Sequence, residues 1–431
     1  MTTSGPAEVE GAVYTAPEDS GTSRVIVPAI DGFRGLAAMA VVLCHVSVGS
    51  GAPPLGSGLL RSIFTSGYMG VDFFFVISGF VLFLPTVVAG GRFGNVRSYG
   101  LRRFARIVPT YYAALATVVL VLPLVSSAPL YLPKTTKGAL SSIVLHLTFL
   151  QHSVGRLRLY EEGFGVLAVI WTLTVEVSFY VLLPIIAARY FRHPFVGFGV
   201  AVVAAQLWKV AVFHAAFAVD WLPGTASTPL LRLILITQLP TYFAHFAAGM
   251  TAAWLFVRWR NLERPWLPWV TVTVQVAAVV GIAGWMRTAG LADLAQTAGP
   301  YDHLTTTLPV ALLFAALVVA TALGPRSAQL LVTNRAARRL GDVSYGIYLW
   351  HAVVVWYALS TLHFQPEGTT GAFLRLLIVT FGASYLLASA SYAGIEKPAI
   401  RWARRRSRRI EAAGATPPAP GDVALTLPAP S

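Results

Sequence analysis

The amino-acid sequence predicts an all-α integral membrane protein with about ten transmembrane helices. Of its 431 residues, 56% are hydrophobic and only 12% are charged, whereas soluble domains carry about 25% charged residues. Ten apolar runs approach or exceed the length of ~20 residues that a helix needs to cross a bilayer. They lie near residues 29–48, 68–90, 107–127, 164–188, 195–219, 229–257, 266–286, 305–323, 344–361 and 372–392.

Basic residues alternate between the two sides of these runs and predict the orientation of the chain. The loops after the second, fourth, sixth and eighth runs are rich in arginine, and the residues after the tenth run add Lys397, Arg401 and Arg404–Arg406. Because positively charged loops stay in the cytoplasm, we expect a multi-pass protein of the cell (inner or plasma) membrane with both termini cytoplasmic. These loops account for the net charge of +14, so we expect the lipid bilayer, and no nucleic acid, as a partner.

Composition divides the chain into three parts. Residues 1–28 are polar and lack the pattern of a signal peptide, so we expect a disordered cytoplasmic tail there. Residues 29–403 hold the transmembrane domain, and residues 404–431 form a basic and then Ala/Pro-rich cytoplasmic tail. The apolar segment 141–153 is too short to cross a bilayer, so we expect a re-entrant or interfacial helix in it.

Two ionisable residues in the first apolar run lie on one helix face. Arg34 and His45 are eleven residues apart, which places them within about 20° on the helix circumference and about 16 Å apart along its axis. A cation near the cytoplasmic face and a proton acceptor deeper in the membrane suit a long anionic substrate such as acyl-CoA. Arg34 would hold phosphate, and His45 would accept a proton from an incoming hydroxyl. Alternatively, Arg34 is a topology anchor and His45 an interior hydrogen-bonded residue.

Further charged residues fall where they could complete such a site. Asp72 begins the second run at the depth that His45 reaches, and a carboxylate there could orient the imidazole; otherwise it caps a helix or pairs with a cation. Arg102, Arg103 and Arg106 cluster at the cytoplasmic entry of the third run, so they are phosphate-binding candidates as well as topology signals.

Three residues in later runs are candidates for lining the acceptor site. Glu176 is the lone acid of the fourth run, and either binds sugar hydroxyls or pairs with an arginine. Tyr348 and His351 lie in the ninth run; a site-lining role and an interior structural role both fit them. The remaining histidines lack metal-ligand spacing, so we expect no metal.

Six segments, taken together and in order, resemble the membrane-bound acyltransferase 3 family. They are DGFRGLAAMAVVLCH, VDFFFVISGF, RRFARIVPTYY, WTLTVEVSFYVLLP, SYGIYLWH and IEKPAIRW, and they run from about residue 29 to 403. In the fourth segment Thr172 and Thr174 replace the serines of the usual pattern, and Val177 and Ser178 replace a Glu-Gln pair, which weakens any transfer of acceptor specificity.

The resemblance implies ten core helices that transfer an acyl group from cytoplasmic acyl-CoA, with acetyl-CoA the expected donor, to a hydroxyl of a sugar-containing acceptor. It matches the family's Arg-x10-His pair to Arg34 and His45, and its acid of the second helix to Asp72. Some members carry an extra extracytoplasmic esterase-like domain; only about 28 residues follow the last segment, so we expect the membrane domain to complete the transfer. The alternative is a secondary transporter or flippase without this chemistry, which the lack of an internal repeat disfavours.

Overall fold

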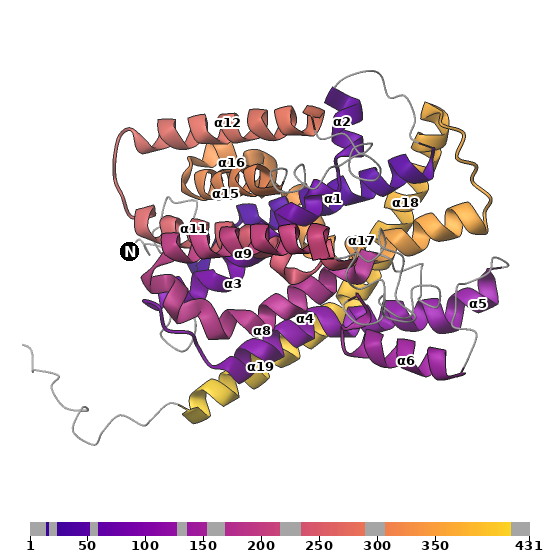
Figure 1. Cartoon of the computed structure of the whole chain (residues 1–431), viewed down its shortest axis with the longest axis horizontal. Helices are drawn as coiled ribbons and strands as arrows, with labels where there is room; N and C mark the ends of the chain where they lie inside the picture. The colour runs from indigo at the N-terminus through magenta and orange to yellow at the C-terminus, as the bar shows by residue number, and fades with distance from the viewer. Residues whose placement is uncertain are drawn as a thin grey trace, which may run out of the picture.

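The computed structural model shows a bundle of long helices. Most of these helices run roughly along the longest axis of the molecule (Figure 1). The structure describes residues 14–16, 24–51, 59–126, 136–152, 169–215, 234–288 and 307–414. Within them, eight helices are long and apolar enough to cross a membrane, or nine if one bent pair counts as a single span. The prediction of an all-α integral membrane protein is therefore confirmed.

Helix α1 (Ala29–Gly49) packs against both α3 (Met69–Val88) and α17 (Arg335–Ser360). Gly35 of α1 packs against Leu340, and Gly341 against the backbone of Asp31. Farther along, the ring of His45 contacts that of His351. Because residue numbers rise together along the contact, α1 and α17 run side by side in the same direction, as the first and ninth spans of the predicted topology should.

Helix α3 also packs closely against α11 (Phe243–Trp259), and a glycine on each helix makes this contact possible. A Cβ added at Gly79 would collide with the carbonyl of Phe246, and one added at Gly249 would collide with the carbonyl of Val76. Glycine at both positions therefore permits the two backbones to touch, which is how helices in membranes commonly gain packing energy.

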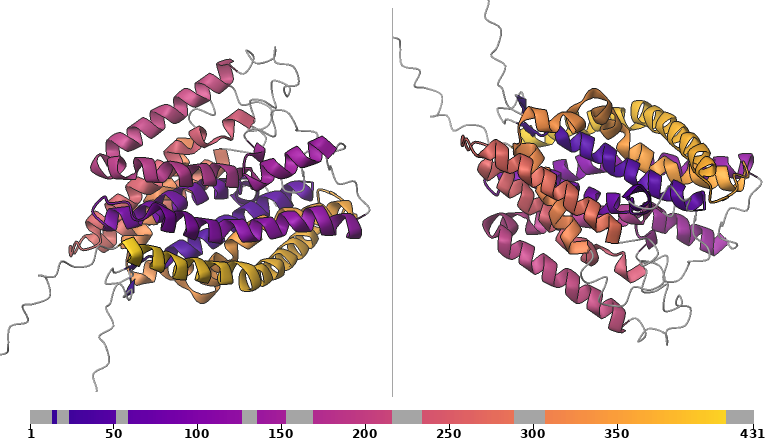
Figure 2. Two further views of the ribbon diagram at one scale, coloured as in Figure 1. Left: turned by 90° about the horizontal axis from the view of Figure 1, so that it is seen from below. Right: turned by 90° about the horizontal axis from the view of Figure 1, so that it is seen from above.

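Helix α4 (Val96–Ala116) begins at Asn95, whose side chain caps the amide of Ser98 at 3.0 Å. It continues through a π-helical turn (Thr117–Val121) into the short α5 (Leu122–Val125). Helix α19 (Lys397–Gly414) lies along α4, as Figures 1 and 2 both show. Ser98 and Ser407 each donate a hydrogen bond to the other's carbonyl at 3.3 Å. The arginine-rich end of the chain is therefore packed against the entry of α4.

The remaining helices complete the bundle around these elements. Gly324 and Pro325 interrupt the helical run after α15, since proline lacks the amide hydrogen that a helix interior needs, and the chain bends there by 116°. Figure 2 shows α9 standing at the edge of the bundle, and its apolar side chains are largely exposed, as lipid-facing side chains are. These helices are α2 (Leu59–Thr65), α8 (Trp171–Arg192), α9 (Pro194–Ala215), α12 (Leu267–Thr288), α15 (Thr307–Leu323), α16 (Arg326–Thr333) and α18 (Thr370–Ser391).

Three segments lie outside the predicted spans: the N-terminal tail, the segment 141–153 and the C-terminal tail. The tail 1–28, predicted to be disordered, contains an antiparallel ribbon that pairs Tyr14–Ala16 with Arg24–Ile26, and its aromatic and β-branched residues favour strands. The short segment 141–153 is covered largely by α6 (Thr136–Leu147), whose 12 residues are too few to cross a bilayer, as predicted. The basic part of the C-terminal tail is helical to Gly414, and the Ala/Pro-rich remainder lies outside the described residues.

Candidate active site

A cavity between α1, α3, α4, α8 and α17 gathers three guanidinium groups, and we call it the arginine cavity. Arg34 comes from the second turn of α1, while Arg103 and Arg106 come from one face of α4. Glu176 of α8 lines the same cavity, and all four side chains are half-buried. Three cations therefore face one carboxylate, so the cavity attracts anions.

Glu176 is held by two hydroxyl donors from different helices. The hydroxyl of Ser78 on α3 donates to Oε1 at 3.1 Å, and that of Tyr180, one turn along α8, donates to the same oxygen at 2.6 Å. Glu176 shares a lining with the three arginines, but among the described residues both contacts of its carboxylate are with hydroxyl groups. Ser78 and Tyr180 are not among the residues predicted for the site, although the four-residue spacing of Glu176 and Tyr180 could have indicated the second contact.

Arg102, predicted to bind phosphate with its neighbours, lies outside the arginine cavity. Its Nη1 is 2.8 Å from Oε1 of Glu411 on α19. Consecutive residues are rotated by about 100° on a helix, so Arg102 and Arg103 face different neighbours. Sequence spacing alone gave no sign that α19 would pack along this flank of α4.

His45 and His351 meet farther along α1, towards the end opposite Arg34. Their ring centroids are 5.0 Å apart and the rings are tilted by 59°. In each residue Nδ1 lies near the carbonyl one turn earlier, at 2.9 Å from Val41 and 3.2 Å from Ile347. Because a carbonyl only accepts, each Nδ1 carries the hydrogen, and Nε2 of the neutral ring keeps a free lone pair. The contact of Nδ1 with the carbonyl of Val41 therefore leaves Nε2 as the basic nitrogen of His45.

The two histidines differ in exposure. His45 is exposed at the surface of the described residues, whereas His351 is fully buried. Nε2 of His351 is buried and has no hydrogen-bond partner among the described residues. A buried imidazole nitrogen without a partner is uncommon in a folded protein. His45 is therefore the accessible base, and His351 is the ring that packs behind it.

Tyr348 connects the arginine cavity with the two histidines. Its side chain lines the cavity, and its ring centroid is 5.7 Å from that of His351. The hydroxyl is 2.8 Å from both the carbonyl of Val169 and Oγ1 of Thr172 at the start of α8. Because the hydroxyl already has partners, the ring of Tyr348 is the part that can contact a substrate.

Asp72 is not next to His45, where we expected it to orient the imidazole. Its Oδ1 instead lies 3.1 Å from Nε2 of the fully buried His245 on α11. Gly70 packs against Ala37 of α1, and Asp72 lies two residues, or about 200°, farther round the helix. Asp72 therefore faces away from α1 and towards α11, and the carbonyl of Val41 orients His45 in its place.

The fold and the site together define a class: a multi-pass membrane protein with a cationic cavity connected, by one tyrosine, to an exposed imidazole. No solved structure matches the chain. The acyltransferase domain of the acyltransferase 3 family matches residues 27–389. The chain belongs to this family, as the six segments predicted.

Curated relatives are about a quarter identical to the chain over the residues that align. The peptidoglycan O-acetyltransferase OatA of Listeria monocytogenes is 25% identical over 393 residues, which are 87% of this chain and 56% of that protein. The acyltransferase MdmB of Streptomyces mycarofaciens is 24% identical, with 89% of this chain and 94% of MdmB covered. The exopolysaccharide production protein ExoZ of Rhizobium meliloti is 28% identical, with 81% and 94% covered. The chain thus matches little more than half the length of the Listeria relative.

Proposed function

We propose that the protein is an integral-membrane O-acyltransferase that moves a short acyl group, acetyl in the first place, from acyl-CoA to a hydroxyl of a sugar-containing acceptor. The observation that carries this proposal is the arrangement along α1. Arg34 lines the arginine cavity at one end of the helix, and His45 meets His351 about 16 Å farther along. The names of the Listeria and Rhizobium relatives support an acetyl group and a polysaccharide acceptor.

The arginine cavity is the proposed site for the phosphates of CoA. Guanidinium groups bind phosphate through paired hydrogen bonds, and Arg34, Arg103 and Arg106 supply three of them in one lining. In our topology, with both termini in the cytoplasm, this cavity opens on the cytoplasmic half of the bundle, where the donor is found. The pantetheine arm then extends past Tyr348 to bring the thioester to His45.

His45 is the proposed general base of the transfer. Nε2 of His45 removes the proton of an acceptor hydroxyl while the hydroxyl oxygen attacks the thioester carbon. The carbon–sulfur bond breaks, the acyl group remains on the acceptor oxygen, and the proton passes from His45 to the departing CoA thiolate. General-base catalysis of this kind contributes about 10²–10⁴-fold to a rate.

The other candidate residues have supporting parts in this proposal. The contact with Val41 fixes the tautomer of His45, and the rings of His351 and Tyr348 pack behind the base and the donor. Asp72 is bound to His245 and so supports the contact of α3 with α11. Glu176, held by Ser78 and Tyr180, adds one negative charge to the lining that the three arginines share.

The experiment that tests the proposal measures transfer of radiolabelled acetyl from acetyl-CoA by the purified protein in detergent. Chitotetraose and a peptidoglycan digest serve as acceptors, and CoA release is followed in parallel. Acetylated saccharide formed with stoichiometric CoA is the expected result. Proteoliposomes that exchange saccharide or acyl-CoA without releasing CoA would instead support a transporter and overturn the proposal.

A further inference from the structure

A second pocket lies at the end of α1 opposite the arginine cavity, and we call it the rim pocket. It is formed by Ser50 after α1, Leu359 near the end of α17, the loop 361–369, and the first turns of α18. His363, Gln365, Glu367 and Arg375 contribute polar side chains to its lining. It is separate from the lining of the arginine cavity.

The loop that carries the pocket is fastened to the helix that carries His45. The amide of Gly368 donates to the carbonyl of Ser50 at 2.9 Å, and the amide of Phe364 donates to the carbonyl of Ala358 at 3.0 Å. A Cβ on Gly51 would lie 2.6 Å from the carbonyl of Pro366. The loop and the end of α1 therefore form one rigid unit, as a site with fixed geometry requires.

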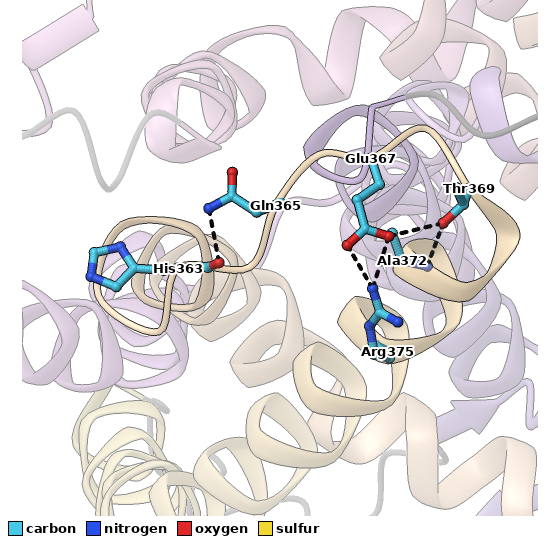
Figure 3. Close-up of polar contacts among 6 residues, drawn as sticks. All are labelled: His363, Gln365, Glu367, Thr369, Ala372 and Arg375. Carbon is cyan, nitrogen blue, oxygen red and sulfur yellow. Dashed lines mark hydrogen bonds and ion pairs between the residues drawn. The ribbon is translucent and has the colours of Figure 1, made fainter.

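The lining of the rim pocket contains an ion pair, Glu367 with Arg375, and an apolar part. Figure 3 shows Arg375 reaching back from α18 to the carboxylate of Glu367, with Nη2 3.0 Å from both of its oxygens. Thr369 donates to the same carboxylate at 3.3 Å. Gln365 lies earlier on the loop, and its Nε2 donates to the carbonyl of His363 at 3.1 Å. Leu359, Leu376 and Phe364 supply the apolar part of the lining.

These groups suit a hydroxyl-bearing ligand without charge. Amide, guanidinium and carboxylate groups together offer donors and acceptors to neighbouring hydroxyls. Because Glu367 and Arg375 neutralise each other, an anionic or cationic ligand gains no net attraction from them. The apolar part of the lining can cover the C–H face of a ring. Side-chain exposures of 45% for Glu367 and 59% for Arg375 keep these groups accessible.

The rim pocket lies in line with the two histidines. His45 and Gly49 are one turn apart on α1, and Gly49 backs onto Val355 and Leu359, which lie one and two turns beyond His351 on α17. Ser50 is therefore only about 7.5 Å farther along the axis than His45. The base thus lies between the arginine cavity at one end of α1 and the rim pocket at the other.

We propose that the rim pocket binds a neutral sugar ring of the acceptor, next to the ring whose hydroxyl is acylated at His45. This inference rests on the proposed acyltransferase function and adds to it the place and the charge class of the acceptor. Donor and acceptor then approach His45 from opposite ends of α1.

Acetyl transfer from acetyl-CoA to chitotetraose, which is neutral, and to tetragalacturonate, which is anionic, tests this proposal. The variants are Gln365→Ala, Arg375→Ala, and the exchanged pair Glu367→Arg with Arg375→Glu, which keeps the ion pair but exchanges donor and acceptor. Arg61→Ala removes an exposed arginine from α2, outside the lining, and is the matched control. The KM values for saccharide and for acetyl-CoA are measured separately.

The expected result is transfer to chitotetraose only, with a KM for chitotetraose raised at least about tenfold in the three pocket variants, because each variant removes or reverses hydrogen-bonding groups that would hold the sugar ring. The KM for acetyl-CoA should stay the same in all of them, and Arg61→Ala should match the wild type. Full recovery in the exchanged pair, an unchanged KM in the single variants, or preferred transfer to tetragalacturonate would overturn the inference.

Two further outcomes separate this inference from the proposed function. If the wild type releases CoA from acetyl-CoA but acetylates neither saccharide, the rim pocket inference fails and the donor chemistry stands. If the wild type neither binds acetyl-CoA nor releases CoA, the proposed function fails and the inference falls with it.

Discussion

The imidazole of His45 lies 5.0 Å from that of His351, and each ring holds Nδ1 against a carbonyl one turn earlier on its own helix. The contact joins α1 to α17, which run in the same direction. It presents Nε2 of an exposed histidine in front of a fully buried one. We expect the buried ring to act through the exposed one.

Replacing His351 by phenylalanine should keep the ring packing and remove the imidazole nitrogens. We expect kcat for acetyl transfer to fall about tenfold or more, because a small displacement of a catalytic group is costly in rate. The KM for acetyl-CoA should not change, since His351 is not in the lining of the arginine cavity. Steady-state kinetics beside thermal unfolding would check this; a raised donor KM at unchanged kcat would contradict it.

Arg106→Ala and Arg102→Ala make the same change one helical turn apart on α4. Only Arg106 lines the arginine cavity, whereas Arg102 is paired with Glu411. We expect Arg106→Ala to raise the Kd for CoA at least about tenfold, since hydrogen bonds to charged groups contribute about 1.5–3 kcal/mol. Arg102→Ala should change it less than about twofold, because an exposed ion pair contributes little. Titration calorimetry with CoA would show the difference, and equal effects would contradict the assignment.

Gly79→Ala and Gly100→Ala should change stability in opposite directions. A Cβ on Gly79 collides with the backbone of Phe246, whereas one on Gly100 meets nothing within 4 Å. We expect Gly79→Ala to destabilise by about 1–3 kcal/mol and Gly100→Ala to stabilise α4 by about 0.5–1 kcal/mol. Thermal unfolding in one detergent would compare them. A stable Gly79→Ala protein would mean that α3 and α11 are farther apart than described.

The proposed topology predicts where two engineered thiols react. In a Cys44→Ala background, which removes the one native cysteine, Gln365→Cys should react with a membrane-impermeant maleimide in intact cells. Arg409→Cys should react only after the cells are opened, because the basic end of the chain is expected in the cytoplasm. Labelling of both thiols from outside, or of neither, would contradict this topology.

Much of the fold could be predicted because bilayer thickness constrains the sequence so strongly. Each predicted apolar run overlaps a described helix, and α1 begins and ends within one residue of its prediction. Eight or nine of the described helices, against the ten predicted, are long and apolar enough to span a membrane, and the run 229–257 is represented by the 17-residue α11. The relation between Arg34 and His45 could also be predicted. Both lie on one helix, so the rotation between them follows from the number of residues that separate them.

Positions that depend on contact between helices could not be obtained by counting. Asp72 was expected at the correct depth, but which of its neighbours it faces depends on Gly70 meeting α1 and Gly79 meeting α11. Arg102 was grouped with Arg103 because nothing in their spacing indicates that α19 covers one flank of α4. The rim pocket was missed for a similar reason, since it is formed by a loop folding back on Ser50.

The central claim is that His45 performs the chemistry while the arginine cavity holds the donor. The most direct test measures, on one preparation of His45→Ala, the Kd for acetyl-CoA and the rate of acceptor-dependent CoA release. We predict a Kd within about twofold of the wild type and a rate lower by at least about 100-fold, the contribution expected of a general base. CoA release at the wild-type rate would contradict the account.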